Sequence, residues 1–427
     1  MRGGVQARCL ARARIAASAI GICVVLLVAA PAESYSVFAH EDAVDALWES
    51  DIVPLLRMKY PRLSDAEILE ARAYAYGGAL IQDLGYYPFG SHLFTNLTHY
   101  VRTGDFVRSL IDGATDGNEY AFALGALAHY ACDTEGHPLA VNPGVPMMYP
   151  KMRARTGARA LYIDSPARHI MVEFAFDVLR VAGGGYAAQG YRDRIGFEVA
   201  KPALERAVRE TYGLKLDDML MSVDLAIATY RKAVSDTIPE VTRLAWRDKR
   251  EEIEKRTPGV TEGSFVYAYS RLDFERDYGA RYRKPGLLAR CLTLLLKIVP
   301  KIGPFKPLAF EPLSQDVEHL FLNSAAAARE RYRVALGALR TAAPDLPNVD
   351  FDTGVPPVPG VNRLADKTYA DLLHKLAKDD FVKAPAPLRH HLQAFFRAYG
   401  RPDGSGQPLG QRTRREVQIL AASPSAP

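Results

Sequence analysis

An apolar stretch of this 427-residue chain contains a row of side chains of the types that bind metal ions. In AFALGALAHYACDTEGHP, His129, Asp133 and His137 follow one another at intervals of four residues. Positions four apart on a helix lie on one face, with their side chains roughly 5–6 Å apart. Zinc accepts both imidazole nitrogen and carboxylate oxygen as ligands. Because small apolar residues precede the row, we predict a buried helix whose polar face requires partners.

A second segment repeats this spacing. In SPARHIMVEFAFD, His169 and Glu173 are again four residues apart, and Asp177 continues the same face. One such pair is more often an ordinary ion pair on a helix than a metal site. Two pairs, one of them extended by a third histidine, favour a metal centre over the alternative, a polar core.

Further metal-binding side-chain types gather in the same half of the chain. Asp83 lies at the end of an apolar segment, GALIQDLGYYPFG, and His40 lies in SVFAHEDAV. Two histidines follow Asp83, and we interpret the first, His92, as a loop residue. His99 is the candidate ligand, because it lies on the apolar face of a predicted helix.

The first 34 residues have the order of a secretory signal peptide. MRGGVQARCLARARIA is basic without an acid, AIGICVVLLVAAPA is apolar, and small residues follow. The apolar run is shorter than the ~20 residues that a membrane span needs, and a retained anchor is the alternative. Cleavage after Ala32 or after Ser34 fits, and the second leaves Tyr35 as the new N-terminus. We expect a secreted or periplasmic protein.

Charge and cysteine content argue against an electrostatic nucleic-acid binder and against a disulfide-rich scaffold. Without residues 1–34 the net charge falls from +5 to +2, with 50 basic against 48 acidic side chains. A nearly neutral protein has no electrostatic preference for nucleic acid, so a nucleic-acid partner is the less favoured one. Two of the four cysteines leave with the signal peptide, and the remaining two do not make a disulfide framework.

The remaining sequence has the periodicity of helices, with no run of alternating strands and no internal repeat. Residues 64–84 open with Ser64 and Glu67 in the spacing of a capping box. Further helices are predicted at 40–58, 92–112, 118–132, 164–182, 197–212, 216–236, 314–342 and 366–398. GYYPFG and HPLAVNPGVPMMYP are predicted to be turn-rich, and the tail from about residue 401 to be disordered.

A charged segment that is broken by Pro258 and Gly259 suggests a domain boundary near residue 245. We therefore expect a catalytic domain at 35–245 and a helical extension with a disordered tail at 246–427. Inside the extension, residues 283–308 are apolar, flanked by Lys and Arg, and free of acids. We favour a buried core helix with snorkelling ends there, and the alternative is a helix on a membrane surface.

The order of the candidate ligands resembles the zinc-dependent phospholipase C family, whose superfamily includes the zinc single-strand nucleases. An N-terminal residue, His, Asp and His are followed by His-x3-Asp-x3-His and His-x3-Glu, over about residues 35–180. The resemblance implies an all-α, multi-helix bundle of the zinc-dependent phospholipase C type with about three zinc ions. It implies that the backbone of Tyr35 and the side chain of His40 bind the first zinc, and that Asp133 bridges this ion to a second. The second zinc is then held by Asp83, His99 and His129. The third is held by His137, His169 and Glu173.

Two positions depart from the family pattern. The N-terminal residue of the best-known members is Trp where this chain has Tyr35, but backbone atoms make that bond. His137 follows Asp133 by four residues, whereas many members have six.

The resemblance also implies a function, the hydrolysis of phosphoesters at the zinc ions, with Asp83 doubling as general base. The secretory signal, the near-neutral charge and the apolar, basic segment favour a phospholipid substrate, with peripheral membrane contact through 283–308. A zinc single-strand nuclease-like hydrolase stays open, because the two reactions share a metal core. A third interpretation is a catalytically inactive domain that binds lipid or a cell-surface partner.

Overall fold

The computed structural model describes residues 37–87, 89–182, 198–220, 222–232, 250–251, 254, 313–342, 344–399 and 409–422. Within these ranges the protein is all-α, as predicted, and the extended residues form one isolated bridge, between Asp350 and Val355. Tyr35, the first 34 residues and segment 283–308 lie outside the described residues, so the predictions made for them stay predictions.

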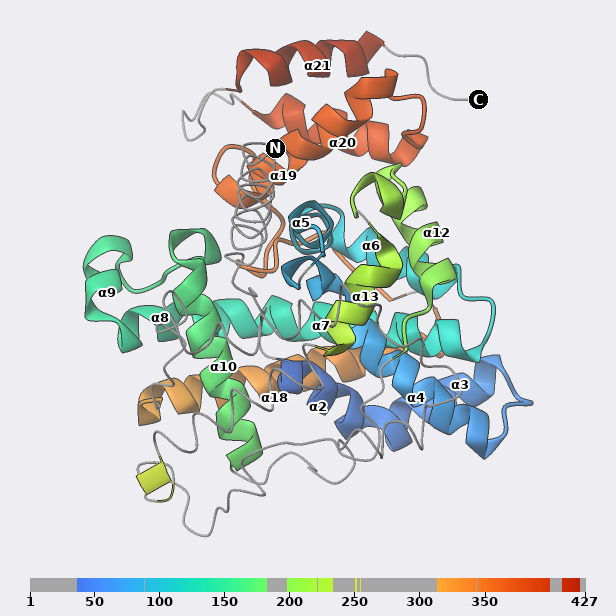
Figure 1. The fold of residues 1–427 in the computed structure, drawn as a ribbon, viewed down its shortest axis with the longest axis vertical. Coiled ribbons are helices and arrows are strands. Elements are labelled where there is room, and N and C mark those ends of the chain that lie inside the picture. Colours follow the sequence, from blue (N-terminus) through green and yellow to red (C-terminus); the bar gives the residue numbers. More distant parts are fainter. Residues whose placement is uncertain are drawn as a thin grey trace, which may run out of the picture.

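The centre of the bundle is the long helix α7 (Gly117–Gly136), against which α4 (Asp65–Leu80) and α18 (Gln315–Ala338) pack (Figure 1). The contact between α4 and α7 is unusually close. A Cβ atom on Gly125 would lie 1.9 Å from the carbonyl oxygen of Ala75, and one on Gly78 would lie 1.9 Å from that of Phe122. Glycine at both positions therefore lets the two helix backbones touch.

Helix α4 begins with the predicted capping box, which the structure confirms. The Ser64 hydroxyl accepts a hydrogen bond from the Glu67 amide, and the Glu67 carboxylate accepts one from the Ser64 amide. Both bonds satisfy donors at the start of the helix that have no partner within it.

The other helices surround this centre, and most coincide with the predicted ones. Their bounds are α2 (Val37–Leu47), α3 (Val53–Lys59), α5 (His92–Tyr100), α6 (Thr103–Asp112), α8 (Asn142–Met148), α9 (Pro150–Thr156), α10 (Pro166–Ala182), α12 (Lys201–Tyr212), α13 (Val223–Lys232), α19 (Arg363–Leu376), α20 (Ala386–Ala398) and α21 (Gln411–Ala422). Short segments of π or 3-10 helix join several of them: η1 (Trp48–Ile52), η2 (Ile81–Tyr86), η3 (His137–Val141), η4 (Tyr162–Asp164), η5 (Leu216–Asp218) and η9 (Ala377–Asp379).

Three predicted helices are broken, one of them at 216–236, where η5 is separate from α13. The helix expected at 92–112 divides into α5 and α6 at Arg102, whose backbone is left-handed, with φ of 51°. The Arg102 guanidinium donates to Asp105 at 2.7 Å and to the carbonyl of Thr211 in α12 at 2.6 Å, which fixes this corner. The helix expected at 366–398 divides into α19 and α20, and Pro385 stands just before α20.

The prediction of turns at residues 137–150 is wrong, because this segment is helical. The π-turn η3 follows α7 directly, and its His137 carbonyl accepts from the amide of Asn142. Pro138 and Pro143 both lie in the first turn of a helical element. A first-turn amide has no partner within the helix, so proline costs little there.

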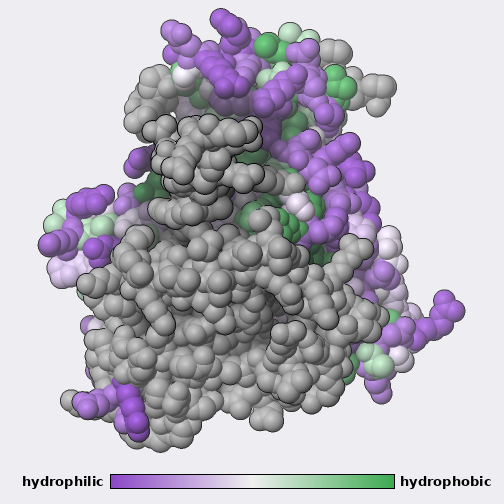
Figure 2. Space-filling view, viewed as in Figure 1, coloured by the Kyte–Doolittle hydropathy of each residue, from purple (hydrophilic) through white to green (hydrophobic). Residues whose placement is uncertain are grey.

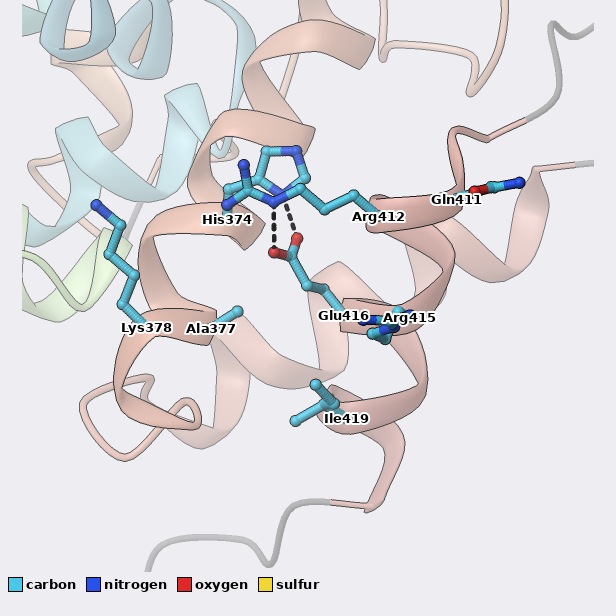
Figure 3. A pocket seen from close by; sticks show the side chains of 8 residues that line it. All are labelled: His374, Ala377, Lys378, Gln411, Arg412, Arg415, Glu416 and Ile419. Atoms are coloured by element: carbon cyan, nitrogen blue, oxygen red, sulfur yellow. Dashed lines mark hydrogen bonds and ion pairs between the residues drawn. The ribbon is translucent and has the colours of Figure 1, made fainter.

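The prediction of a disordered tail is wrong for α21. This helix is rich in charge, but Thr413, Glu416 and Leu420 form a buried face against α19 and α20. An open pocket of about 550 Å³ lies beside this contact (Figure 3). Glu416 lines this pocket, and its carboxylate forms ion pairs with His374 and, at 2.9 Å, with Arg412.

The described part of the extension packs directly on the helices that carry candidate ligands. Helix α18 lies along α7, and α19 packs on α5 (Figure 1). The exposed side of α20 and α21 is mainly hydrophilic in Figure 2. The described residues include no helix that is both long and apolar enough to span a bilayer. The domain boundary near residue 245 stays a prediction.

Candidate metal centre

Eight of the nine candidate ligands lie in the described residues, and they converge on one buried centre. None of the eight is more than 4% exposed. They form three groups, each with its ligand atoms within 4.8 Å of one another: His40, His129 and Asp133; Asp83, His99 and His129; and His137, His169 and Glu173. Six elements contribute, namely α2, η2, α5, α7, η3 and α10.

Asp133 lies at the middle of the first two groups. Its Oδ2 is 3.1 Å from Nε2 of His129 and 3.3 Å from Nε2 of His99, and its Oδ1 is 3.4 Å from Nε2 of His40. Neither oxygen accepts a well-aligned hydrogen bond within the described part of the chain. Burial opposes ionisation, but the imidazoles, above all His129, hold the pKa of Asp133 well below its usual value. Asp133 is therefore an ionised carboxylate that faces imidazoles of both groups.

The orientation of two histidine rings identifies which nitrogen faces this carboxylate. Nδ1 of His129 is 2.8 Å from the carbonyl oxygen of Ala79, and Nδ1 of His99 is 2.8 Å from that of Thr95. A carbonyl only accepts, so both Nδ1 atoms carry the hydrogen and both Nε2 atoms turn towards the centre. These Nε2 atoms are 3.4 Å apart. Two neutral rings in this arrangement cannot hydrogen-bond to each other.

Asp83 completes the negative side of the second group. Its Oδ1 is 3.3 Å from Nε2 of His99 and 4.0 Å from Nε2 of His129. Burial alone would lower the pKa of His99, but Asp133 and Asp83 raise it to about 10. The centre thus attracts positive charge. In the absence of a metal ion a proton on His99 supplies that charge.

His40 is a neutral base on the opposite side of Asp133. Burial and, to a smaller extent, the neighbouring His129 lower the pKa of His40 to about 3. The two rings are stacked, with centroids 4.2 Å apart. A neutral imidazole is the form that binds a metal ion.

The third group has the same arrangement of ring, carbonyl and carboxylate. Nε2 of His169 is 2.6 Å from the carbonyl oxygen of Ala160, so its Nδ1 is left to face Glu173 at 3.8 Å. Nδ1 of His137 is also 3.8 Å from that Glu173 oxygen, and Nε2 of His137 is 3.8 Å from Oδ2 of Asp133. Burial and, to a smaller extent, the neighbouring His137 lower the pKa of His169 to about 3.

These separations suit zinc. Two ligands that are each ~2.1 Å from one tetrahedral ion lie about 3.4 Å apart. The groups show 3.1–3.8 Å between carboxylate oxygens and imidazole nitrogens in most pairs, and all of these except the 3.1 Å between His129 and Asp133 exceed the length of a normal hydrogen bond. The buried oxygens of Asp133 and the Nδ1 of His169, which lack a hydrogen-bond partner in the described residues, are the atoms that an ion would satisfy. The donor set therefore fits zinc, although the role of each residue as a ligand stays a prediction.

The structure separates the two histidines that follow Asp83. His99 is buried beside Asp83. The interpretation of His92 as a loop residue is wrong, because it is the first residue of α5, where it is exposed with its ring 6.2 Å from that of Tyr86. Asp177 is buried one turn beyond Glu173 but belongs to none of the three groups found among the described residues.

Two tyrosines flank the groups. The rings of Tyr86 and Tyr162 have centroids 6.0 Å apart, and Tyr86 meets His99 edge-on at 6.0 Å while Tyr162 meets His169 edge-on at 5.9 Å. Burial raises the pKa of both tyrosines far above the usual value. Both phenols therefore keep their hydrogen and are donors at neutral pH.

Sequence reasoning missed one contribution to the centre, the segment 346–352. The Phe351 ring lies 5.3 Å from that of His99 and 6.1 Å from that of His129, and its amide donates to the His99 carbonyl at 3.1 Å. Asp352, which is also buried, accepts from the amide of Tyr162 at 2.9 Å. The available signal was the sequence NVDFD, two acids around an aromatic residue in a stretch rich in Pro and Gly.

Residues 40–216 match the zinc dependent phospholipase C family. The match spans 177 of the 427 residues and makes this part of the chain similar to that family. The match includes all eight described candidate ligands, and it ends before α18, α19 and segment 346–352. No curated protein and no solved structure matches the chain. The family match and the three groups together indicate a zinc-dependent hydrolase of the phospholipase C type, for which phospholipid is the implied substrate.

Proposed function

We propose that the protein is a secreted, zinc-dependent phosphodiesterase that hydrolyses the head-group phosphoesters of phospholipids with about three zinc ions. The observation that carries this proposal is the pair of inward-facing Nε2 atoms of His99 and His129, 3.4 Å apart between two carboxylates. Such a site is built for cations, and the family match supports zinc.

Each ion has its own set of side chains in this proposal. His40 and Asp133 hold the first together with the backbone of Tyr35, which lies only two residues before the start of α2. Asp83, His99 and His129 hold the second, which shares Asp133. His137, His169 and Glu173 hold the third.

The side chains around the centre have distinct tasks in the reaction. When bound, zinc polarises the phosphoester and makes water a nucleophile at neutral pH. Burial opposes ionisation of Asp83, but His129 and His99 keep its pKa low, so its carboxylate can accept the proton of the attacking water. The protonated phenols of Tyr86 and Tyr162 can donate hydrogen bonds to phosphate oxygens.

Substrate and location follow from different observations. Phospholipid is supported by the family match and by the near-neutral charge of the chain without residues 1–34. Secretion is supported by the basic, apolar and small-residue order of those residues. Peripheral contact with the membrane would come from segment 283–308 under the alternative interpretation of that segment as a membrane-surface helix.

Hydrolysis assays with a matched pair of variants test the proposal. The full-length chain, purified without chelator, is incubated with phosphatidylcholine vesicles and, separately, with single-stranded DNA. We expect zinc-dependent release of the phosphorylated head group. Asp83→Asn should reduce the rate by about 100-fold or more, as expected for loss of a general base. Asp371→Asn, which removes only a surface ion pair with Lys367, should leave the rate unchanged.

The other outcomes identify the rival functions. Cleavage of DNA without cleavage of lipid would replace phospholipid by nucleic acid as the substrate. A zinc-loaded protein that cleaves neither would be a binding domain rather than an enzyme.

A further inference from the structure

Segment 346–352 lies more than 100 residues beyond the family match, yet it is tied to the helices that form the metal centre. Its bonds reach α5, α6 and α7: Phe351 N–H to His99 O at 3.1 Å, Thr103 Oγ1 to Val349 O at 2.9 Å, Asn348 Nδ2 to Asp105 Oδ2 at 3.1 Å, and Tyr130 Oη to Pro347 O at 2.8 Å. Hydrogen bonds therefore fix the segment to α5, α6 and α7, and two of these helices, α5 and α7, carry candidate ligands.

A continuous chain of hydrogen bonds leads from Asp352 to His169. The backbone carbonyl of Asp352 accepts from Nδ2 of Asn142 at 2.6 Å. The Asn142 carbonyl accepts from the amide of Ala160 at 2.9 Å, and the Ala160 carbonyl accepts from Nε2 of His169 at 2.6 Å. The Asp352 carboxylate meanwhile accepts from the amide of Tyr162, two residues beyond Ala160. Asp352 thus holds residues 160–162 from two sides.

This chain determines which nitrogen of His169 faces the third group. Because the Ala160 carbonyl takes the hydrogen on Nε2, Nδ1 is the nitrogen turned towards Glu173. Partners of this kind fix the tautomer and the angle of a metal-binding ring, and losing one typically weakens metal binding by about 10- to 100-fold.

Asp352 is itself held rigidly. The Asp350 carboxylate accepts from the Asp352 amide at 2.9 Å and from Nδ2 of Asn362 at 3.0 Å, which closes a tight turn. Gly354 in this turn has φ of 73°, and a Cβ atom there would lie 2.7 Å from the carbonyl oxygen of Thr134 in α7. The turn is therefore pressed against the helix that carries His129 and Asp133.

The burial of Asp352 argues for a specific task. The residue is 4% exposed, and its Oδ1 has no hydrogen-bond partner in the described residues. Leaving a buried polar atom unsatisfied costs about 1–3 kcal/mol, a cost that an apolar side chain would avoid.

We propose that Asp352 is a positioning residue for the third metal group, His137, His169 and Glu173, and that residues outside the family match therefore complete the metal centre. This inference rests on the proposed zinc centre. It predicts that the chain of bonds through Asn142 controls one ion and leaves the other two in place.

Zinc retention in four variants tests this inference. Full-length wild-type protein and the variants Asp352→Ala, Asp352→Asn, Asn142→Ala and Asp345→Ala are dialysed against chelators of increasing strength, and bound zinc is counted by elemental mass spectrometry. We expect Asp352→Ala and Asn142→Ala to lose one zinc ion to a chelator whose zinc affinity is about 10- to 100-fold lower than the affinity needed to remove that ion from the wild-type protein. Both variants should keep the other ions. Asp352→Asn keeps an oxygen that can accept from Tyr162 and should behave as wild type. Asp345→Ala removes an exposed carboxylate of the same region and should have no effect.

Three results would contradict the positioning role of Asp352 or the proposed function. Wild-type zinc retention in both Asp352→Ala and Asn142→Ala would overturn the positioning role. Loss of all ions together, with loss of helical circular dichroism, would assign the segment a general structural role instead. If Asp352→Ala does not fold, Asn142→Ala decides alone. A wild-type protein without zinc would overturn the proposed function itself, which the same measurement shows separately.

Discussion

His99 and His129 face each other through their Nε2 atoms at 3.4 Å, and each ring donates the hydrogen on its Nδ1 atom to a main-chain carbonyl. Neutral rings in this geometry have two lone pairs directed at the same space. The carboxylates of Asp83 and Asp133 lie at the edge of that space, so it favours a cation. Zinc and a proton on His99 compete for this place.

The first prediction concerns the choice between two histidines. His99→Ala should remove a ligand of the second group, and the protein should then retain at least one zinc ion fewer than wild type. His92→Ala is the matched control, because His92 is exposed on the same helix and should leave zinc content unchanged. Zinc counting by elemental mass spectrometry distinguishes the two, and the reverse pattern would make His92 the ligand.

The second prediction concerns the stability of the zinc-depleted protein as pH changes. His40 and His169 have folded pKa values of about 3, below the usual 6.5, so the unfolded state binds more protons between these values. Their contribution to the free energy of unfolding is therefore lost as pH falls from about 6.5 towards 3. His99 has a raised pKa of about 10, so its contribution is fully present below 6.5 and is lost as pH rises through 10.

Urea unfolding of the zinc-depleted protein at pH 4, 7 and 10 measures this dependence. We expect the midpoint to be highest near pH 7 and lower at both extremes. A midpoint that stays constant from pH 7 to pH 4 would contradict the buried, neutral state of His40 and His169.

The sequence predicts the part of the centre that depends on local spacing. His129 with Asp133 and His169 with Glu173 each lie on one helix, so the four-residue interval was enough to place each pair on one face. The capping box at Ser64 is local in the same way. The family resemblance then grouped residues from different helices.

Other parts depend on contacts that no local pattern records. Asp352 reaches Asn142 across 210 residues of sequence, and Phe351 reaches His99 across about 250. The helical course of residues 137–148 was missed because prolines usually mark turns, whereas Pro138 and Pro143 lie in first turns and Pro146 lies inside α8. Helix α21 was missed because only one side of a charged segment is buried.

The third prediction concerns the close contact between α4 and α7. Gly125→Ala should force the helices apart, because its Cβ would lie 1.9 Å from the Ala75 carbonyl. That shift moves the Ala79 carbonyl away from His129, so we expect lower zinc affinity together with lower stability. Gly337→Ala is the control in a helix with open space around it, and it should be neutral or stabilising by about 0.5–1 kcal/mol. Zinc titration and thermal unfolding measure both effects, and equal behaviour of the two variants would be inconsistent with the contact.

The fourth prediction separates stability from the metal centre. Ser64→Ala removes the cap of α4 and should lower the free energy of unfolding by about 1 kcal/mol. Zinc content should stay at the wild-type value, because Ser64 is exposed and contacts none of the candidate ligands. Ser50→Ala, at another exposed serine outside a capping box, should change neither quantity. Loss of zinc in Ser64→Ala would show that the centre depends on the start of α4.

The most direct test of the central claim is the zinc content of the secreted and processed protein, purified without chelator and measured by elemental mass spectrometry. Close to three zinc ions per chain is the predicted result. A protein without bound zinc would contradict the account, and His129, Asp133 and His137 would then belong to a polar core.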